Sequence, residues 1–309
     1  MIVTKKISQW IEKYEDYNFT VNLTCGTKIM SIATYEFFKD FGSKMIYIPF
    51  PKNEFFEVYP FKKHSQLNPI SLRLGVIEYL TAYSLKLTNE TKKEAEERKE
   101  LTGWIVENYK NIETTLAELY KKLGTFRNLE SFTLNIEISD LNQLRKDFLN
   151  KIGFNINGNT ISKNLSRSEI RYLTGGWLEE YVYNCVNSLK GKGIDDVVIN
   201  IEIENPQSNR NEFDIMFTKD NALYFVECKS LSPENELTQI SLYKIGTLQK
   251  EFGLRVQSFY LTTSPHIIKN GQIRHYVKAR AEQFKTGIVK PDELINFEKI
   301  IRKTLKIPE

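Results

Sequence analysis

The stretch from 211 to 230, NEFDIMFTKDNALYFVECKS, most constrains what this chain can fold into. Two runs rich in Phe, Ile, Tyr and Val flank the tripeptide Lys-Asp-Asn at 219–221, and Asp and Asn are turn residues. The pattern therefore predicts two antiparallel strands joined by a tight turn. Counting back along both strands from a two-residue loop at Asp220-Asn221 places Asp214 directly opposite Glu227.

Strand side chains alternate between the two faces of a sheet. One face of this hairpin then carries four charged residues: Glu212, Asp214, Glu227 and Lys229. The other face carries four apolar residues: Phe213, Ile215, Val226 and Cys228. Two opposed carboxylates repel each other unless a positive charge lies between them, and unpaired charge beside apolar neighbours is costly. The alternative is a solvated charged face.

Asp214 and Glu227 offer hard oxygen ligands, which suit Mg²⁺ or Mn²⁺, and the sequence has no His/Cys set that would favour zinc. A divalent ion held there could generate hydroxide from water and neutralise charge on a phosphate oxygen. Lys229 would orient or deprotonate that water and offset the developing charge. The alternative for Lys229 is a surface ion pair with Glu227 or Glu212.

Length and composition predict a soluble intracellular protein of two or three domains. Of the 309 residues 41% are hydrophobic and 27% charged, which is typical of globular chains. Lys and Arg exceed Asp and Glu by 43 to 39, a surplus that permits an anionic partner without requiring one. The three cysteines have no metal-ligand spacing, and no apolar run approaches bilayer length, so we expect a reduced cytoplasmic setting and no membrane.

Residues 1–65 have the pattern of an α/β domain. The pattern predicts a strand from Phe19 to Leu23, a small-residue turn and a helix from Ile29 to Phe38. This arrangement directs backbone N–H groups at a phosphate. Four residues of the turn would bind an anionic ligand: Thr24, Gly26, Thr27 and Lys28.

Residues 66–161 are mainly helical. The charged run at 89–100, NETKKEAEERKE, predicts one solvated helix face. A strand-like segment follows at 132–136, then a helical segment at 140–150 and an Asn-Gly hairpin signal at 155–161. This order of elements resembles a winged helix.

Residues 162–309 predict a small α/β sheet with the carboxylates at its centre, in the order helix, three strands, helix, strand. The first helix has a buried stripe that includes Leu178 and Val182. Glu179 borders that stripe and Glu180 points nearly away from it, so Glu179 is the better candidate to reach the site. Further on, basic side chains are candidate phosphate contacts or an ordinary solvated surface: Lys269, Arg274, Lys278, Arg280 and Lys285.

A Glu on a helix, followed by Asp and then Glu-x-Lys on consecutive strands, resembles the PD-(D/E)xK nuclease superfamily. The resemblance implies catalytic roles for Glu179, Asp214, Glu227 and Lys229, with the three carboxylates as metal ligands. Gln239 and Tyr243, one helical turn apart, resemble the auxiliary Gln-xxx-Tyr pair of some branches.

The motifs at 175–179 (GGWLE) and 22–28 (NLTCGTK) occur together in a narrower group. They resemble the CARF-domain effector nucleases of type III CRISPR systems, in antiviral defence. This resemblance implies a homodimer whose CARF domain binds cyclic tetra-adenylate at the 24–28 loop and activates a Mn²⁺- or Mg²⁺-dependent nuclease that cuts DNA or RNA. Only about twenty residues precede the loop, so an N-terminally truncated CARF domain is expected. Cys25 stands where the family usually has Gly, which restricts backbone angles in the turn.

Two other functions are consistent with the same residues. One is a restriction- or repair-type DNA nuclease that needs no activating ligand. The other is a nucleotide-sensing, DNA-binding regulator with a silent nuclease fold. Opposed carboxylates together with Lys229 argue against the regulator, because without a cation they would only cost stability.

Overall fold

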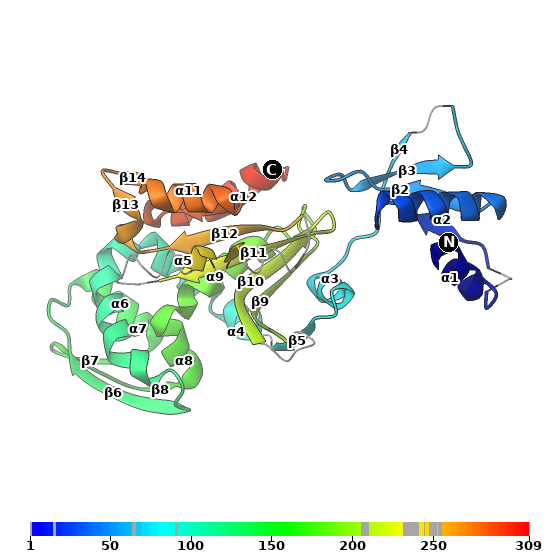
Figure 1. Ribbon diagram of the computed structural model, residues 1–309. Coiled ribbons are helices and arrows are strands. Elements are labelled where there is room, and N and C mark those ends of the chain that lie inside the picture. The colour runs from blue at the N-terminus through cyan, green and yellow to red at the C-terminus, as the bar shows by residue number, and fades with distance from the viewer. Residues whose placement is uncertain are drawn as a thin grey trace. The chain divides into compact units, whose positions relative to one another are not determined.

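A computed structural model describes residues 2–14, 17–63, 66–89, 92–204, 210–230, 241–243, 245–246, 252 and 255–308. The chain divides into two compact units, residues 1–73 and 74–309, and each is considered by itself. Both are mixed α/β structures, as predicted (Figure 1). The expected three-part division at 65 and 161 stays a prediction.

The first unit contains a four-stranded sheet with the order β1-β2-β3-β4. Strands β1 (Thr20–Asn22) and β2 (Lys44–Tyr47) are parallel and are connected through helix α2 (Lys28–Asp40), which gives the Rossmann-like strand–helix–strand crossover. Strands β3 (Glu54–Tyr59) and β4 (Leu67–Pro69) continue the sheet antiparallel. Helix α1 (Ile2–Ile11) packs against α2, and the small core includes Ile11, Phe38 and Met45.

The second unit begins with helix α3 (Val76–Ala82) and strand β5 (Lys86–Asn89). Helices α4 (Lys92–Glu97), α5 (Lys99–Glu107) and α6 (Tyr109–Leu123) follow, and then the short 3-10 turn η1 (Gly124–Phe126). The single solvated helix predicted over 89–100 is wrong. Its first residue ends β5, an edge strand of the large sheet, and residues 92–100 are divided between α4 and α5 at Arg98.

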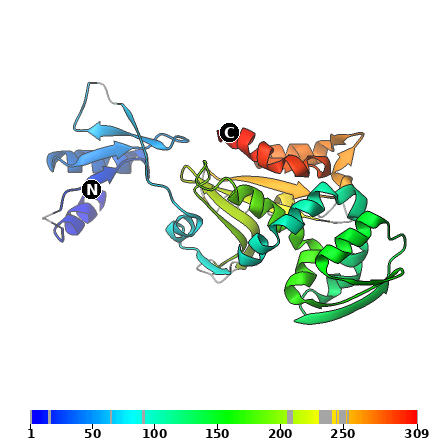
Figure 2. The same cartoon turned by 180° about the vertical axis from the view of Figure 1, so that it is seen from behind.

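A small three-stranded antiparallel sheet with the order β6-β8-β7 follows. Its strands are β6 (Ser131–Glu137), β7 (Asn155–Asn157) and β8 (Thr160–Ser166), and α7 (Gln143–Ile152) connects β6 to β7. Both views show this sheet beside α7 and the next helix, α8 (Arg167–Arg171) (Figures 1 and 2). Helices followed by a small hairpin sheet give the winged-helix-like arrangement expected from the sequence.

The large sheet has six strands in the order β15-β12-β11-β10-β9-β5. Strands β9 (Asp196–Glu204), β10 (Arg210–Lys219) and β11 (Ala222–Lys229) are antiparallel, while β12 (Gln257–Thr262) and β15 (Thr286–Val289) continue parallel to β11. The sequence did not predict β5 and β15, the two edge strands.

Helices cover both faces of the large sheet, and two separate apolar clusters result. One cluster includes α9 (Trp177–Asn187) and α12 (Phe297–Leu305), and the other includes α3 and α11 (His275–Gln283). Burial on both faces explains why β11 is apolar from Ala222 to Val226 rather than alternating. The short elements η3 (Pro265–Ile267), β13 (Ile268–Lys269), β14 (Gln272–Ile273) and η4 (Pro291–Asn296) complete this part.

Candidate active site

The central hairpin has the predicted register. Lys219 pairs with Ala222 and Ile215 with Val226, so the next positions along the two strands are Asp214 and Glu227. Asp220 and Asn221 have φ of 51° and 57°. Two left-handed residues form the tight turn whose twist matches that of the strands.

The predicted alternation of faces breaks at Asp214. Ile215, Val226 and Cys228 lie in the cluster that includes α9, as one face should, but Phe213 lies in the opposite cluster. The neighbouring strand makes the same change, since Ile199 lies in the first cluster and Ile201 in the second.

The cause of this switch is a local distortion at Asn200, whose φ is 52° in the middle of β9. The pairing runs from Ile215–Ile199 to Phe213–Ile201 and omits Asp214 and Asn200 between them. Strand irregularities of this kind redirect side chains and occur often beside active sites. Asp214 and Asn200 both line the same cavity.

Asp214 is partly buried and held from the neighbouring strand. Its Oδ2 accepts a hydrogen bond from the backbone N–H of Cys228 across 2.6 Å. Burial, followed by the charges of Glu227 and Glu179, raises the pKa of the Asp214 carboxyl well above its usual range. The three carboxylates are therefore near enough to repel one another, which is the condition that a cation relieves.

Lys229 forms an ion pair with Glu227, with 2.7 Å between Nζ and Oε1. The Glu227 side chain is 5% exposed and that of Lys229 is 35% exposed. Burial by itself would lower the pKa of Lys229, but the carboxylates of Asp214, Glu227 and Glu179 outweigh it and raise the pKa overall. Lys229 therefore carries a positive charge that the neighbouring carboxylates stabilise.

The structure separates the roles of the two adjacent glutamates on α9. Burial raises the pKa of Glu179, with Lys229 and Arg127 acting in the opposite direction, so Glu179 lies within the electrostatic reach of the site. Glu180, which we expected to point nearly away from the buried stripe of α9, is only 6% exposed because α4 and α5 also pack against this helix. Arg98 between α4 and α5 donates to both of its carboxylate oxygens, which explains its burial.

Glycine allows α9 to approach the end of β11. Gly175 lies in the π-helical turn η2 (Tyr172–Gly176) with φ of 133°, which only glycine adopts readily. A Cβ atom at this position would lie 2.8 Å from Oγ of Ser230, the residue after Lys229. The Gly175-Gly176 pair noted in the sequence therefore serves close packing beside the catalytic candidates.

Among the described residues, no group of three or more His, Cys, Asp or Glu side chains is arranged closely enough to hold a metal ion. The donor chemistry nevertheless suits a hard divalent cation, since Asp214 and Glu227 are adjacent carboxylates and Glu179 adds a third nearby charge. These residues would hold the ion once Oε1 of Glu227 is released from its ion pair with Lys229.

The auxiliary residues expected on the following helix are only partly described. Gln239 lies outside the described residues. Tyr243 is 49% exposed, and the guanidinium carbon of Arg280 lies 3.8 Å from its ring centroid. Nothing in the described contacts connects Tyr243 to the carboxylates.

The candidate ligand loop in the first unit is exposed and joins β1 to α2. Thr27 caps α2, with its side chain accepting from the N–H of Met30 at 3.3 Å, and Gly26 has φ of 90°. Thr24 accepts from the N–H of Ile48 at 2.7 Å, which fixes the loop to the end of β2. The left-handed position is Gly26, and Cys25 has no positive φ, so its replacement of Gly costs no strain.

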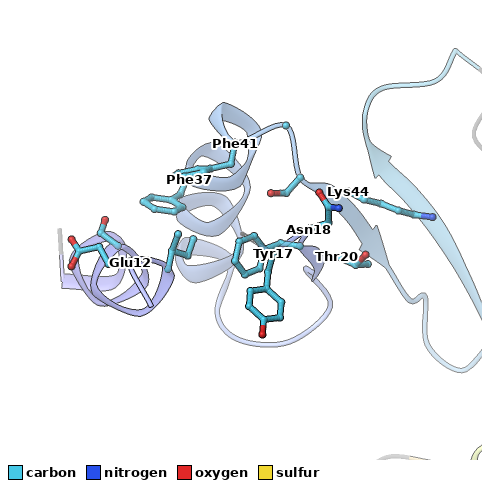
Figure 3. A pocket seen from close by; sticks show the side chains of 12 residues that line it. Glu12, Tyr17, Asn18, Thr20, Phe37, Phe41 and Lys44 are labelled. Carbon is cyan, nitrogen blue, oxygen red and sulfur yellow. The ribbon is translucent and has the colours of Figure 1, made fainter. Parts of the chain in front are cut away.

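A cavity of about 800 Å³ lies at the other end of β1 and α2 (Figure 3). Phe37 from α2 and Phe41 directly after it, with ring centroids 5.0 Å apart, line the cavity together with Tyr17, Thr20 and Lys44. None of the four loop residues lines this cavity. The loop and the cavity are therefore separate features.

In the part of the chain that the structure describes, no helix has the length and apolarity needed to cross a bilayer.

Comparison with known proteins finds two family matches, one near each end of the chain. The family described as "Card1-like, endonuclease domain" matches residues 166–307, and the family described as "Card1 CARF domain" matches residues 1–79. Protein VC1899 from Vibrio cholerae is similar in structure, with a TM-score of 0.80 and 20% identity over 99% of this chain and 80% of that chain. Can2 from Sulfobacillus thermosulfidooxidans, solved in complex with cyclic tetra-adenylate, has a TM-score of 0.71 and 21% identity. That match covers 96% of this chain and 80% of that chain. No curated protein matches the sequence.

Proposed function

We propose that this chain, which matches the Card1 CARF domain and the Card1-like endonuclease domain families, is a divalent-metal-dependent nuclease activated by cyclic tetra-adenylate in type III CRISPR defence. The observation that supports this most directly is the grouping of four side chains from the middle of β10, the end of β11 and the first turn of α9: Asp214, Glu227, Lys229 and Glu179. The substrate is the phosphodiester bond of DNA or RNA.

An endonuclease domain implies a divalent cation in general, and we propose Mn²⁺ or Mg²⁺, held by Asp214 and Glu227 with Glu179 nearby. The bound ion would lower the pKa of a water and neutralise charge on the phosphate. The chain's own contribution is positional and electrostatic. Cys228 fixes the Asp214 carboxylate through its backbone N–H. Lys229 offsets the negative charge that develops on the phosphate oxygens, because its ammonium stays protonated.

We further propose that the activator's phosphates bind at the 24–28 loop. The positive φ of Gly26 and the start of α2 expose backbone N–H groups there, and Lys28 adds an exposed charge. Can2, whose fold this chain shares, was solved with cyclic tetra-adenylate. A homodimer would present two such loops to one cyclic ligand.

The test is cleavage of single-stranded and supercoiled substrates in Mn²⁺, with and without cyclic tetra-adenylate. We expect cleavage that depends on the activator and is abolished by EDTA, by Asp214→Ala and by Glu227→Ala. Undiminished cleavage by both variants would overturn the assignment of the site. An equal rate without the activator would instead support the ligand-independent nuclease.

A further inference from the structure

The cavity beside the carboxylates is lined by both acidic and basic side chains. It has a volume of about 690 Å³. Its acidic lining residues come from α4, α9 and the large sheet: Glu94, Glu179, Glu180, Glu202, Glu212 and Asp214. Its arginines come from outside that sheet: Arg98, Arg127, Arg167 and Arg171.

Arg98 is already engaged within the protein. It donates to both oxygens of Glu180, it donates to Oγ of Ser168 at 3.1 Å, and its guanidinium lies 4.8 Å from the Tyr172 ring centroid. This arginine therefore has a structural role.

Arg127 and Arg171 differ from Arg98. Both are exposed, and within the described residues neither side chain makes a hydrogen bond or an ion pair. Arg127 lies near enough to Glu179 to lower the pKa of that carboxyl, which places its charge beside the candidate catalytic group. Both guanidinium groups are available to an anion in the cavity.

Arg167 is only partly engaged within the protein. It pairs with the 85% exposed Glu130 at 3.0 Å and donates to the Asn128 carbonyl at 2.9 Å, yet its Nε is buried without a hydrogen-bond partner among the described residues. Its backbone N–H also donates to the Glu130 carbonyl at 2.9 Å. These bonds join the segment after η1, which begins with Arg127, to the start of α8, which ends with Arg171.

We propose that Arg127, Arg167 and Arg171 bind the phosphodiester backbone of the substrate strand next to the phosphate that is cut. This inference rests on the proposed nuclease function and extends it to Arg127 from the winged-helix-like region and to Arg167 and Arg171 from α8. A guanidinium offers a planar fork that matches phosphate oxygens. Attraction to these arginines would guide the strand past carboxylates that by themselves repel it.

The basic residues on and before α11 are poorer candidates. Arg280 is stacked on Tyr243, Nε of Arg274 donates to the His266 carbonyl, and Lys278 lies 3.9 Å from Glu282. None of them lines the cavity. The two surfaces can therefore be compared directly.

The test is binding of labelled single-stranded DNA and RNA to the full chain in EDTA, with saturating cyclic tetra-adenylate, over a range of salt concentrations. For the double variant Arg127→Gln/Arg171→Gln we expect weaker binding of both strands. The slope of log K against log salt should fall by about 0.7 for each phosphate that the variant no longer neutralises. The control Lys278→Gln/Lys303→Gln removes the same charge from exposed positions outside the cavity and should bind like the wild type.

An unchanged affinity and slope in the arginine variant would overturn the proposal, as would wild-type protein that binds neither strand at low salt. A larger loss in the lysine control would favour the surface on α11 and α12 instead. Wild-type cleavage in Mn²⁺ tests the nuclease function separately, so an active enzyme with an unchanged arginine variant would reject only this inference. A melting temperature equal to that of the wild type would exclude misfolding as the cause of weaker binding.

Discussion

Nζ of Lys229 lies 2.7 Å from Oε1 of Glu227, and the Glu227 side chain is almost fully buried. The surrounding carboxylates raise the pKa of Lys229 above its usual value. Lys229 therefore supplies positive charge beside these carboxylates. The ion pair with Glu227 that the sequence offered as an alternative is present, but Glu227 is buried, so it is not an ordinary surface pair.

Replacing Lys229 by Gln should lower kcat about 10²–10³-fold, because one charge that stabilises the transition state is lost. Lys229→Arg keeps the charge and should retain part of the activity. The measurement is single-turnover cleavage in Mn²⁺ with activator present. A rate for Lys229→Arg as low as that for Lys229→Gln would contradict a purely electrostatic role.

Asp214→Asn should stabilise the metal-free protein at neutral pH. The folded-state pKa of Asp214 is raised, so above about pH 4 the folded chain retains a proton that the unfolded chain has released. The unfolding free energy of the wild type therefore falls as pH rises, and the Asn variant lacks this contribution because its side chain does not titrate. Its melting temperature in EDTA should exceed that of the wild type increasingly from pH 4 to pH 8, by about 2–4 °C for each kcal/mol.

Addition of Mn²⁺ should reverse that order. A cation that binds only the folded state raises the melting temperature, and Asp214→Asn removes one of its ligands. We therefore expect a smaller Mn²⁺-induced shift in the variant. An equal shift in both proteins would mean that Asp214 is not a ligand.

The hairpin could be predicted almost completely, because turn chemistry and the apolar runs fix its register locally. The change of faces at Asp214 could not, because period-two counting contains no signal for a left-handed residue on a neighbouring strand. Asn200 comes from β9, and only the assembled sheet shows that it lies beside Asp214. The signal that could have been used is a lone Asn within an Ile- and Val-rich strand.

The left-handed backbone at Asn200 can be tested with two substitutions. Asn200→Gly permits positive φ, whereas the β-branched Asn200→Val opposes it and should displace Asp214. Misplacement of about 1 Å can cost about 10²-fold in rate, so we expect the Val variant to cleave far more slowly than the Gly variant. Equal losses would assign the effect to the Asn side chain instead of the backbone.

Glu179→Gln and Glu180→Gln should separate catalysis from stability. Glu179 lies in the electrostatic range of Asp214 and Lys229, so its Gln variant should lose cleavage without a fall in melting temperature. Glu180→Gln leaves Arg98 without its charged partner and should cost about 1–3 kcal/mol of unfolding free energy. Thermal denaturation and cleavage of both variants check this. If Glu180→Gln lost cleavage and Glu179→Gln lost stability instead, the two roles would have to be exchanged.

The role of Glu180 illustrates what helical periodicity alone misses. The helix has a predictable buried stripe, but a second layer formed by α4 and α5 covers the opposite side as well. That layer comes from the charged run at 89–100, whose composition predicts exposure. Arg98 and Glu180 are 82 residues apart, and their pairing exists only in the folded unit.

Lys28→Glu should abolish activation without affecting the nuclease itself. Lys28 begins α2 and is exposed, so the substitution places a negative charge where we propose that the activator's phosphates bind, and it should leave the fold intact. Calorimetric titration with cyclic tetra-adenylate should show lost binding. The nearby control Lys39→Glu changes the same charge in the last turn of α2, away from the loop, and should bind normally. Normal activation of Lys28→Glu would place the ligand elsewhere in the first unit, and the aromatic cavity at the other end of α2 would become the next site to mutate.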